Sequence, residues 1–146
     1  MERKEFIKAC GFSCLGLIVG SAILESCATS KVIEAKNNND VIEIAIGEFT
    51  VMKGEKIKEL KHLLVKTKRL EFPIVVFKNS DTSYDALLLA CTHQANELNI
   101  NGDILTCPAH GSEFTKTGEI ISGPADKPLK SFKVLHDYMN IYIHLV

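Results

Sequence analysis

The stretch CTHQANELNINGDILTCPAHGSEF, residues 91–114, holds two short segments that share a composition. The first is Cys91-x-His93 and the second is Cys107-x-x-His110, in a chain with only five cysteines and five histidines. Between them, alternating apolar and polar residues flank Asn101-Gly102-Asp103, which predicts a β-hairpin centred on Asn-Gly. A hairpin at this place would bring both segments to one end of a sheet, where two thiols and two imidazoles could hold metal.

The rest of the chain predicts an all-β domain. Short apolar or alternating runs, such as VIEIAIGEF, FPIVVFK and NIYIHLV, recur at intervals of about 8 to 14 residues with Gly, Asn, Asp or Pro between them. No long amphipathic helix and no internal repeat is evident. The expected fold is therefore a small β-sandwich or barrel with the two Cys/His loops at one end.

The N-terminal residues are expected to lie outside this domain. The apolar run Ala9–Leu24 is shorter than the roughly 20 residues that span a bilayer, and it suits an export signal. The sequence LESC that follows resembles a bacterial lipobox, so we expect residues 1–26 to be a lipoprotein signal and Cys27 to be lipidated. Residues 27–40 are expected to form a flexible tether, and 41–146 the domain.

Two features of the N-terminal segment leave alternatives open. The apolar run could also remain as an uncleaved anchor with an incidental cysteine. The charged start RKEFIK resembles a twin-arginine signal, so export in a folded state and general secretion are both possible routes. In each case the predicted location is the cell envelope, with the domain attached to a membrane and facing the periplasm or the outside.

The loops, together with GPADKPL at residues 123–129, resemble a Rieske protein. The resemblance covers residues 41–146 and implies a Rieske-type β-fold that binds a 2Fe–2S cluster. It implies that Cys91 and Cys107 hold one iron and that His93 and His110 hold the other.

The same resemblance implies supporting roles for residues beside the four ligands. Ser112 stands where some members aim a hydroxyl at a bridging sulfide, and Gly111 and Gly123 would let the backbone approach the sulfides. Pro124 would stiffen a third, covering loop. Phe114 stands where high-potential members have a tyrosine hydroxyl near a ligand sulfur.

The sequence also departs from the usual Rieske pattern. Asn96 and Ala109 occupy the positions that form an inter-loop disulfide in many high-potential members, so this chain lacks that bridge. The thirteen residues Gln94–Thr106 make a shorter connection between the loops than is usual. Replacing two thiolates by neutral imidazoles raises the reduction potential of such a cluster to about −150 to +300 mV, and the lost tyrosine predicts a value below the top of that range.

The function implied is one-electron transfer, as an electron carrier or as a redox subunit of an envelope oxidoreductase or respiratory chain. The partners expected are a membrane and a redox protein, which could be a cytochrome or a quinol-oxidising complex. A net charge of −1 and the absence of Trp disfavour nucleic acid as a partner.

Two other functions compete with electron transfer. The first is a zinc-binding lipoprotein that uses the same Cys2His2 set for structure. The second is a lipoprotein that keeps the fold for binding alone. The remaining histidines have no ligand-like neighbours in sequence and are assigned no role; they are His62, His136 and His144.

Overall fold

The computed structural model describes residues 30–35 and 40–146. The predicted signal and Cys27 lie outside these ranges. In the part of the chain that is described, no helix is long and apolar enough to cross a membrane.

Nearly all regular structure in the described residues is β-strand. The elements in chain order are β1 Lys31–Glu34, β2 Val41–Ala45, the 3-10 turn η1 Ile46–Phe49, β3 Thr50–Lys53, β4 Lys56–Glu59, β5 His62–Lys66, β6 Ile74–Ser80, β7 Ser83–Leu88, β8 Asn99–Asn101, β9 Ile104–Thr106, β10 Glu113–Thr115, β11 Ile120–Ser122, β12 Ser131–His136 and β13 Asn140–His144. The expectation of an all-β domain is confirmed.

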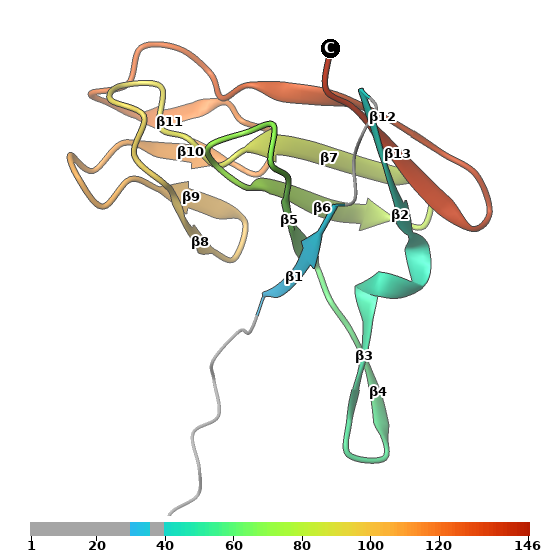
Figure 1. Ribbon diagram of the computed structural model, residues 1–146. Coiled ribbons are helices and arrows are strands. Elements are labelled where there is room, and N and C mark those ends of the chain that lie inside the picture. Colours follow the sequence, from blue (N-terminus) through green and yellow to red (C-terminus); the bar gives the residue numbers. More distant parts are fainter. Residues whose placement is uncertain (1–29, 36–39) are drawn as a thin grey trace, which may run out of the picture.

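The larger sheet forms the body of the domain. It has seven strands in the order β1-β5-β6-β7-β12-β13-β2 and curls on itself (Figure 1). Alternation places Ile42 and Ile44 of β2 inside, while the central strand β6 begins with a run that is buried on both faces. The first core group lies within this curl and includes Phe49, Leu63 and Ile141.

The smaller sheet lies next to the two Cys/His loops, because the first loop precedes β8 and the second joins β9 to β10. Its four strands follow the order β11-β10-β9-β8, and β8 and β9 form the expected hairpin. The turn is centred one residue later than predicted, because Asn101 pairs with Ile104 and leaves Gly102-Asp103 as the loop. Only Gly102 has positive φ, at 65°, which is the pattern of a type II′ turn rather than the predicted Asn-Gly turn with two positive-φ residues.

A second core group supports the small sheet. Phe114 and Leu105 are fully buried there, and the group also contains Leu89, Cys91 and Cys107. The two cysteines are therefore part of a packed apolar layer, which holds the loops that bear them.

Residues 31–34 were predicted to belong to a flexible tether, but the structure shows them as a strand. They form β1, which pairs in parallel with β5 from Lys31 opposite Leu63 to Glu34 opposite Lys66. For these four residues the prediction was wrong, because KVIE shows no alternation of apolar and polar residues and the strand with which it pairs lies about thirty residues away in sequence.

Candidate metal centre

The first loop begins where β7 gives way to an isolated bridge between Ala90 and Glu97. The Cys91 N–H donates to the Asn96 carbonyl at 2.8 Å, and the Ala95 N–H donates back to the Cys91 carbonyl at 2.8 Å. Ala95 is the single non-glycine residue with positive φ among the described residues, at 49°. The loop is thus closed on itself by its own backbone, with His93 at its outer turn.

The second loop repeats this arrangement between β9 and β10. The Cys107 N–H donates to the Ser112 carbonyl at 2.8 Å, and the Gly111 N–H donates to the Cys107 carbonyl at 3.0 Å. Gly111 has φ of 77° and corresponds in position to Ala95. The two loops share one hydrogen-bond pattern, although the histidine comes two residues after Cys91 and three residues after Cys107.

The two thiols lie side by side and away from solvent. Each cysteine is 3% exposed, and both are free. Burial by itself raises the pKa of the Cys107 thiol, but backbone N–H groups of Ala109 and His110 and the Cys91 side chain hydrogen-bond the sulfur and lower that pKa below its ordinary value. The loop therefore favours the thiolate, which is the form that binds metal.

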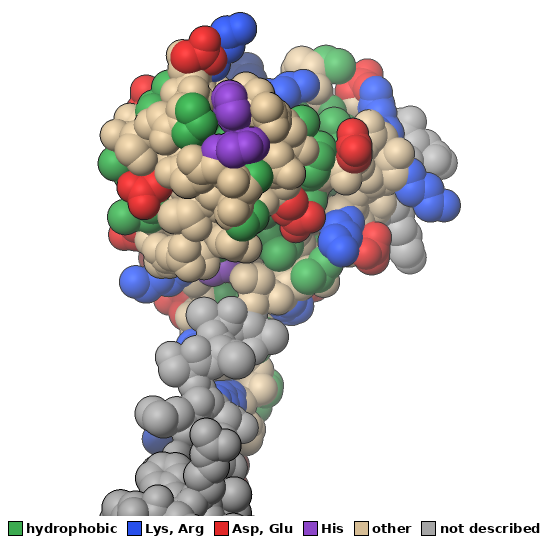
Figure 2. Space-filling model, turned by 90° about the vertical axis from the view of Figure 1, so that its left-hand side faces the viewer, with side chains coloured by type: hydrophobic (Ala, Val, Ile, Leu, Met, Phe, Trp, Pro, Cys, Tyr) green, Lys and Arg blue, Asp and Glu red, His purple; other side chains and the backbone are tan. Residues whose placement is uncertain are grey.

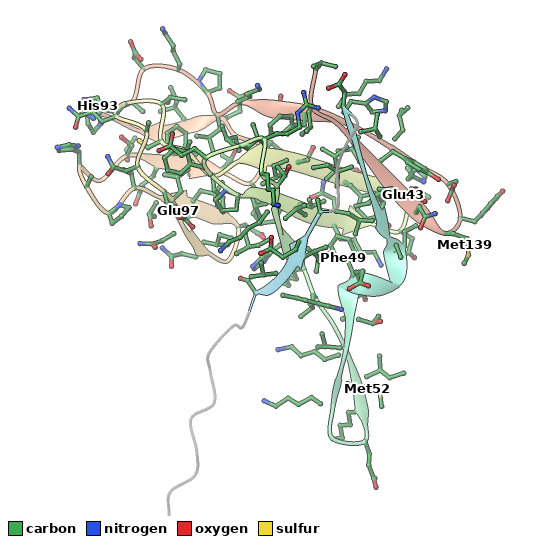
Figure 3. All side chains as sticks on the ribbon, in the orientation of Figure 1. Glu43, Phe49, Met52, His93, Glu97 and Met139 are labelled. Atoms are coloured by element: carbon green, nitrogen blue, oxygen red, sulfur yellow. The ribbon has the colours of Figure 1, made fainter. Side chains whose placement is uncertain are left out.

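The two imidazoles form a separate, exposed pair. The ring centroids of His93 and His110 lie 5.0 Å apart with an interplanar angle of 88°. Figure 3 places His93 at the far end of the molecule, and Figure 2 shows a pair of histidine side chains at the surface of that end. Over residues 30–35 and 40–146, no three His, Cys, Asp or Glu side chains converge as closely as a single metal ion requires.

A third loop closes over the other two. It contains a cis peptide bond between Gly123 and Pro124. The Ala125 N–H donates to the Oγ of Ser112 at 3.0 Å, and the Thr92 hydroxyl donates to the Lys127 carbonyl at 2.7 Å. The third loop is therefore hydrogen-bonded to each of the Cys/His loops.

The structure places the eight cluster-site residues that the sequence indicated in three loops joined by hydrogen bonds, and it adds contributors that the sequence did not reveal. Ala125, Thr92 and Ala95 act through backbone conformation or a single hydrogen bond, and nothing in their local sequence marks them. A Cβ at Gly111 would meet no protein atom within 4 Å, so within the protein its positive φ, rather than close packing, is the visible reason for glycine.

The donor set fits a binuclear centre with two kinds of ligand. Two buried sulfurs form one pair and two exposed imidazoles form the other, and the buried Ser112 hydroxyl lies in the loop that carries one member of each pair. Thiolate and imidazole are the ligands of iron in mixed Cys/His iron–sulfur sites.

Comparison with known protein families decides the assignment. A family model described as the Rieske [2Fe-2S] domain matches residues 47–133, which is more than half of the chain. The chain belongs to the Rieske family. Its cofactor is a 2Fe–2S cluster, as the sequence resemblance implied.

Two curated relatives of this Rieske chain are cytochrome b6-f complex iron-sulfur subunits. The protein from Chlorobaculum tepidum is 39% identical over 62 residues, covering 41% of this chain and 34% of the relative. The protein from Chlorobaculum thiosulfatiphilum is 32% identical over 90 residues, covering 60% and 48%. The chain thus matches about a third to a half of the length of these relatives.

A solved structure shows the same Rieske fold. The cyanobacterial plasma membrane Rieske protein PetC3 from Synechocystis PCC 6803 aligns with a TM-score of 0.50 and 28% identity, over 57% of this chain and 85% of that chain. The expectation of a Rieske-type β-domain is therefore confirmed.

Proposed function

We propose that this protein is a one-electron carrier in which Cys91 and Cys107 hold one iron of the cluster and His93 and His110 hold the other. A bound 2Fe–2S cluster of this ligand type supplies a one-electron couple at a potential well above that of four-cysteine ferredoxins. The observation that carries the assignment is the separation of the four donors into a buried thiol pair and an exposed imidazole pair.

The same separation distinguishes the cluster from a zinc site. Structural zinc takes four ligands around one ion at about 2.0 to 2.3 Å, so both thiols and both imidazoles would have to converge on one point. Here the sulfurs hydrogen-bond each other inside the apolar layer, whereas the two rings meet edge to face at the surface.

Different groups of the protein would have different roles at such a centre. The apolar layer around Cys91 and Cys107 keeps water from the sulfurs, and the Ala109 and His110 N–H groups stabilise negative charge on Cys107. The exposed edges of His93 and His110 offer the shortest route between the interior and a docked partner. Ser112 of the second loop is fully buried and its Oγ accepts from the third loop, so its hydroxyl hydrogen would be free to donate to a cluster sulfur.

The cellular setting is also part of the proposal. Lipidation at Cys27 after loss of residues 1–26 would tether the domain to a membrane of the cell envelope, facing the periplasm or the outside. The similarity to cytochrome b6-f iron-sulfur subunits and to a plasma membrane Rieske protein supports a cytochrome or quinol-oxidising complex as the partner. The exposed histidine pair is the surface that we assign to that contact.

Metal and sulfide analysis of anaerobically purified protein tests the function. We expect two irons and two inorganic sulfides per chain, a red-brown colour and an EPR signal on reduction. A colourless protein with one zinc would replace the proposal by the structural zinc alternative. Folded protein without metal or sulfide would favour a binding role without redox chemistry.

A further inference from the structure

The β3–β4 hairpin extends away from the body of the domain. Figure 1 shows it projecting as a narrow ribbon, and Figure 3 places Met52 near its end. All four residues of β4 are exposed, and β3 is paired with no strand other than β4 in the described residues. Neither the proposed ligands nor the third loop uses this hairpin.

The two faces of the ribbon differ in character. Met52 pairs with Ile57 across the hairpin, so both side chains lie on one face, where they are 70% and 73% exposed. Successive strand residues alternate between faces, which places Lys53, Lys56 and Lys58 on the opposite face. One face near the tip therefore carries the apolar pair, and the opposite face carries three lysines.

The charge of this region is positive. Residues 50–61 contain four lysines and two glutamates. Glu59, one of the two glutamates, forms an ion pair with Lys78 of β6 at the foot of the hairpin. Glu55 is the second glutamate, so lysines outnumber acidic residues in the hairpin. Lysines beside exposed apolar side chains suit an anionic lipid surface, because the long stems lie along apolar material while the ammonium groups reach phosphate.

The start of the described chain lies against the base of the same hairpin. Ser30 hydrogen-bonds His62 at 2.8 Å, and together with Lys58, Glu59 and Leu60 it lines a cavity of about 270 Å³. Lys31 also forms an ion pair with Glu48, two residues before β3, at 2.7 Å. The chain therefore enters the domain beside the foot of the hairpin.

Chain length then relates the hairpin to the proposed lipid anchor. Three peptide steps join Cys27 to Ser30, so these two residues are at most about 11 Å apart. Each strand of the hairpin has four residues and is about 13 Å long. This length is similar to the greatest possible distance between Cys27 and Ser30. A membrane that holds Cys27 is within reach of the hairpin tip.

We infer that the β3–β4 hairpin is a second membrane contact, which inserts its tip into the interface of an anionic bilayer, so that Met52 and Ile57 on one face meet apolar chains while Lys56 and Lys58 on the other face reach the headgroups. The inference rests on the proposed lipid anchor for its geometry, although the amphipathic ribbon has its own affinity for such a surface. Two contacts orient a tethered domain, whereas a lipid chain alone leaves it free to rotate.

The absence of Trp from the chain makes a direct test possible. Met52→Trp places a single Trp on the hairpin, and Met139→Trp places one on the β12–β13 turn, where Met139 is 72% exposed and lies well away from the hairpin (Figure 3). Each variant is expressed as the full chain, purified with its cluster and reconstituted into vesicles of phosphatidylglycerol and phosphatidylethanolamine. Emission is compared between ordinary and brominated lipid for each variant, so that quenching by the cluster cancels.

Brominated lipid is expected to quench the Met52→Trp emission by roughly twofold or more and to leave the Met139→Trp emission unchanged. Adding Lys56→Glu and Lys58→Glu to the Met52→Trp variant, or replacing phosphatidylglycerol by phosphatidylcholine, should reduce the quenching, as should high salt. Equal quenching of both reporters, or quenching of neither, would overturn the proposal. The latter result would assign the apolar pair to another surface, such as a partner protein.

Mass spectrometry of the same samples separates this inference from the anchor. Lipidated Cys27 without quenching at residue 52 would overturn the hairpin contact and leave the anchor intact. Quenching at residue 52 in protein whose Cys27 is unmodified would support the hairpin contact and refute the anchor. The visible spectrum of each variant confirms that the loops still hold the cluster.

Discussion

The Ala125 N–H donates to the Ser112 Oγ at 3.0 Å, and the Ser112 side chain is fully buried. A hydroxyl that accepts from the third loop still has its own hydrogen to donate. One side chain can therefore hold the third loop in place and, in the proposed centre, stabilise a cluster sulfur.

Ser112→Ala is expected to affect both stability and potential. It leaves the Ala125 N–H buried without a partner, which costs about 1–3 kcal/mol in the free energy of unfolding. It also removes a hydrogen-bond donor from the cluster, so the midpoint potential should fall. Ser122→Ala is the control, because Ser122 is exposed and its hydroxyl reaches only Glu113. An unchanged potential in Ser112→Ala would remove the sulfur contact from the proposal.

Replacing a proposed ligand should abolish the cluster. His93→Asn and His110→Asn are expected to lose the visible absorption and most bound iron, because one iron would lack an imidazole ligand. His136→Asn is the matched control, since His136 is exposed on β12 and its ring lies 5.9 Å from that of Tyr84 at the start of β7. If either ligand variant kept the spectrum of the parent protein, the ligand assignment would be wrong.

The potential should lie below the upper end of the Rieske range, which is about +300 mV. Phe114 is fully buried in the apolar layer beside both cysteines and has no hydroxyl to offer a ligand sulfur. Phe114→Tyr should therefore raise the midpoint measured by redox titration at neutral pH. A parent midpoint already at the upper end would contradict this reading of the position.

Gly111→Ala tests the conformation of the second loop. A Cβ there would meet no protein atom, so the cost is that of placing alanine at φ of 77°, about 1 kcal/mol. Because Ala95 already adopts positive φ at the same position of the first loop, the variant should fold and bind the cluster. Thermal unfolding of the two proteins measures the cost, and complete loss of the cluster would show that the cofactor itself requires glycine.

Acid should weaken the turn between β12 and β13. The pKa of Asp137 is lowered by hydrogen bonds from the backbone N–H groups of Met139 and Asn140, and from the hydroxyl of Tyr142. A lowered pKa in the folded state contributes stability that is present above the unfolded value of about 3.9 and is lost as the pH falls through the folded value. Asp137→Asn should therefore be less stable than the parent at pH 6.

The gap between these two proteins should narrow as the pH is lowered below about 4. Thermal unfolding of both proteins at pH 6 and pH 3 measures it. Asp126→Asn, at an exposed position of the third loop, provides a control for a change of charge alone. A gap that stays constant with pH would show that these hydrogen bonds do not depend on the carboxylate.

The local sequence predicted the buried faces of the strands, the metal-binding loops and one hairpin. Alternating apolar residues specify which faces of the strands are buried, as at Ile42 and Ile44, and the paired Cys/His segments identify the metal-binding loops. The hairpin between β8 and β9 was also evident, because a turn depends on a few neighbouring residues. These features depend on contacts between residues that are close in the chain.

Only the tertiary structure decided the rest, because those features depend on contacts between distant segments. The pairing of β1 with β5 and the hydrogen bond from Ala125 to Ser112 join residues that no local pattern relates. The β3–β4 hairpin differs from these examples, because its two strands pair with each other and are close in sequence. Its exposure nevertheless depends on the tertiary structure, since neither strand joins the large sheet. Whether a residue has a partner is a property of the assembled sheet and not of its own segment.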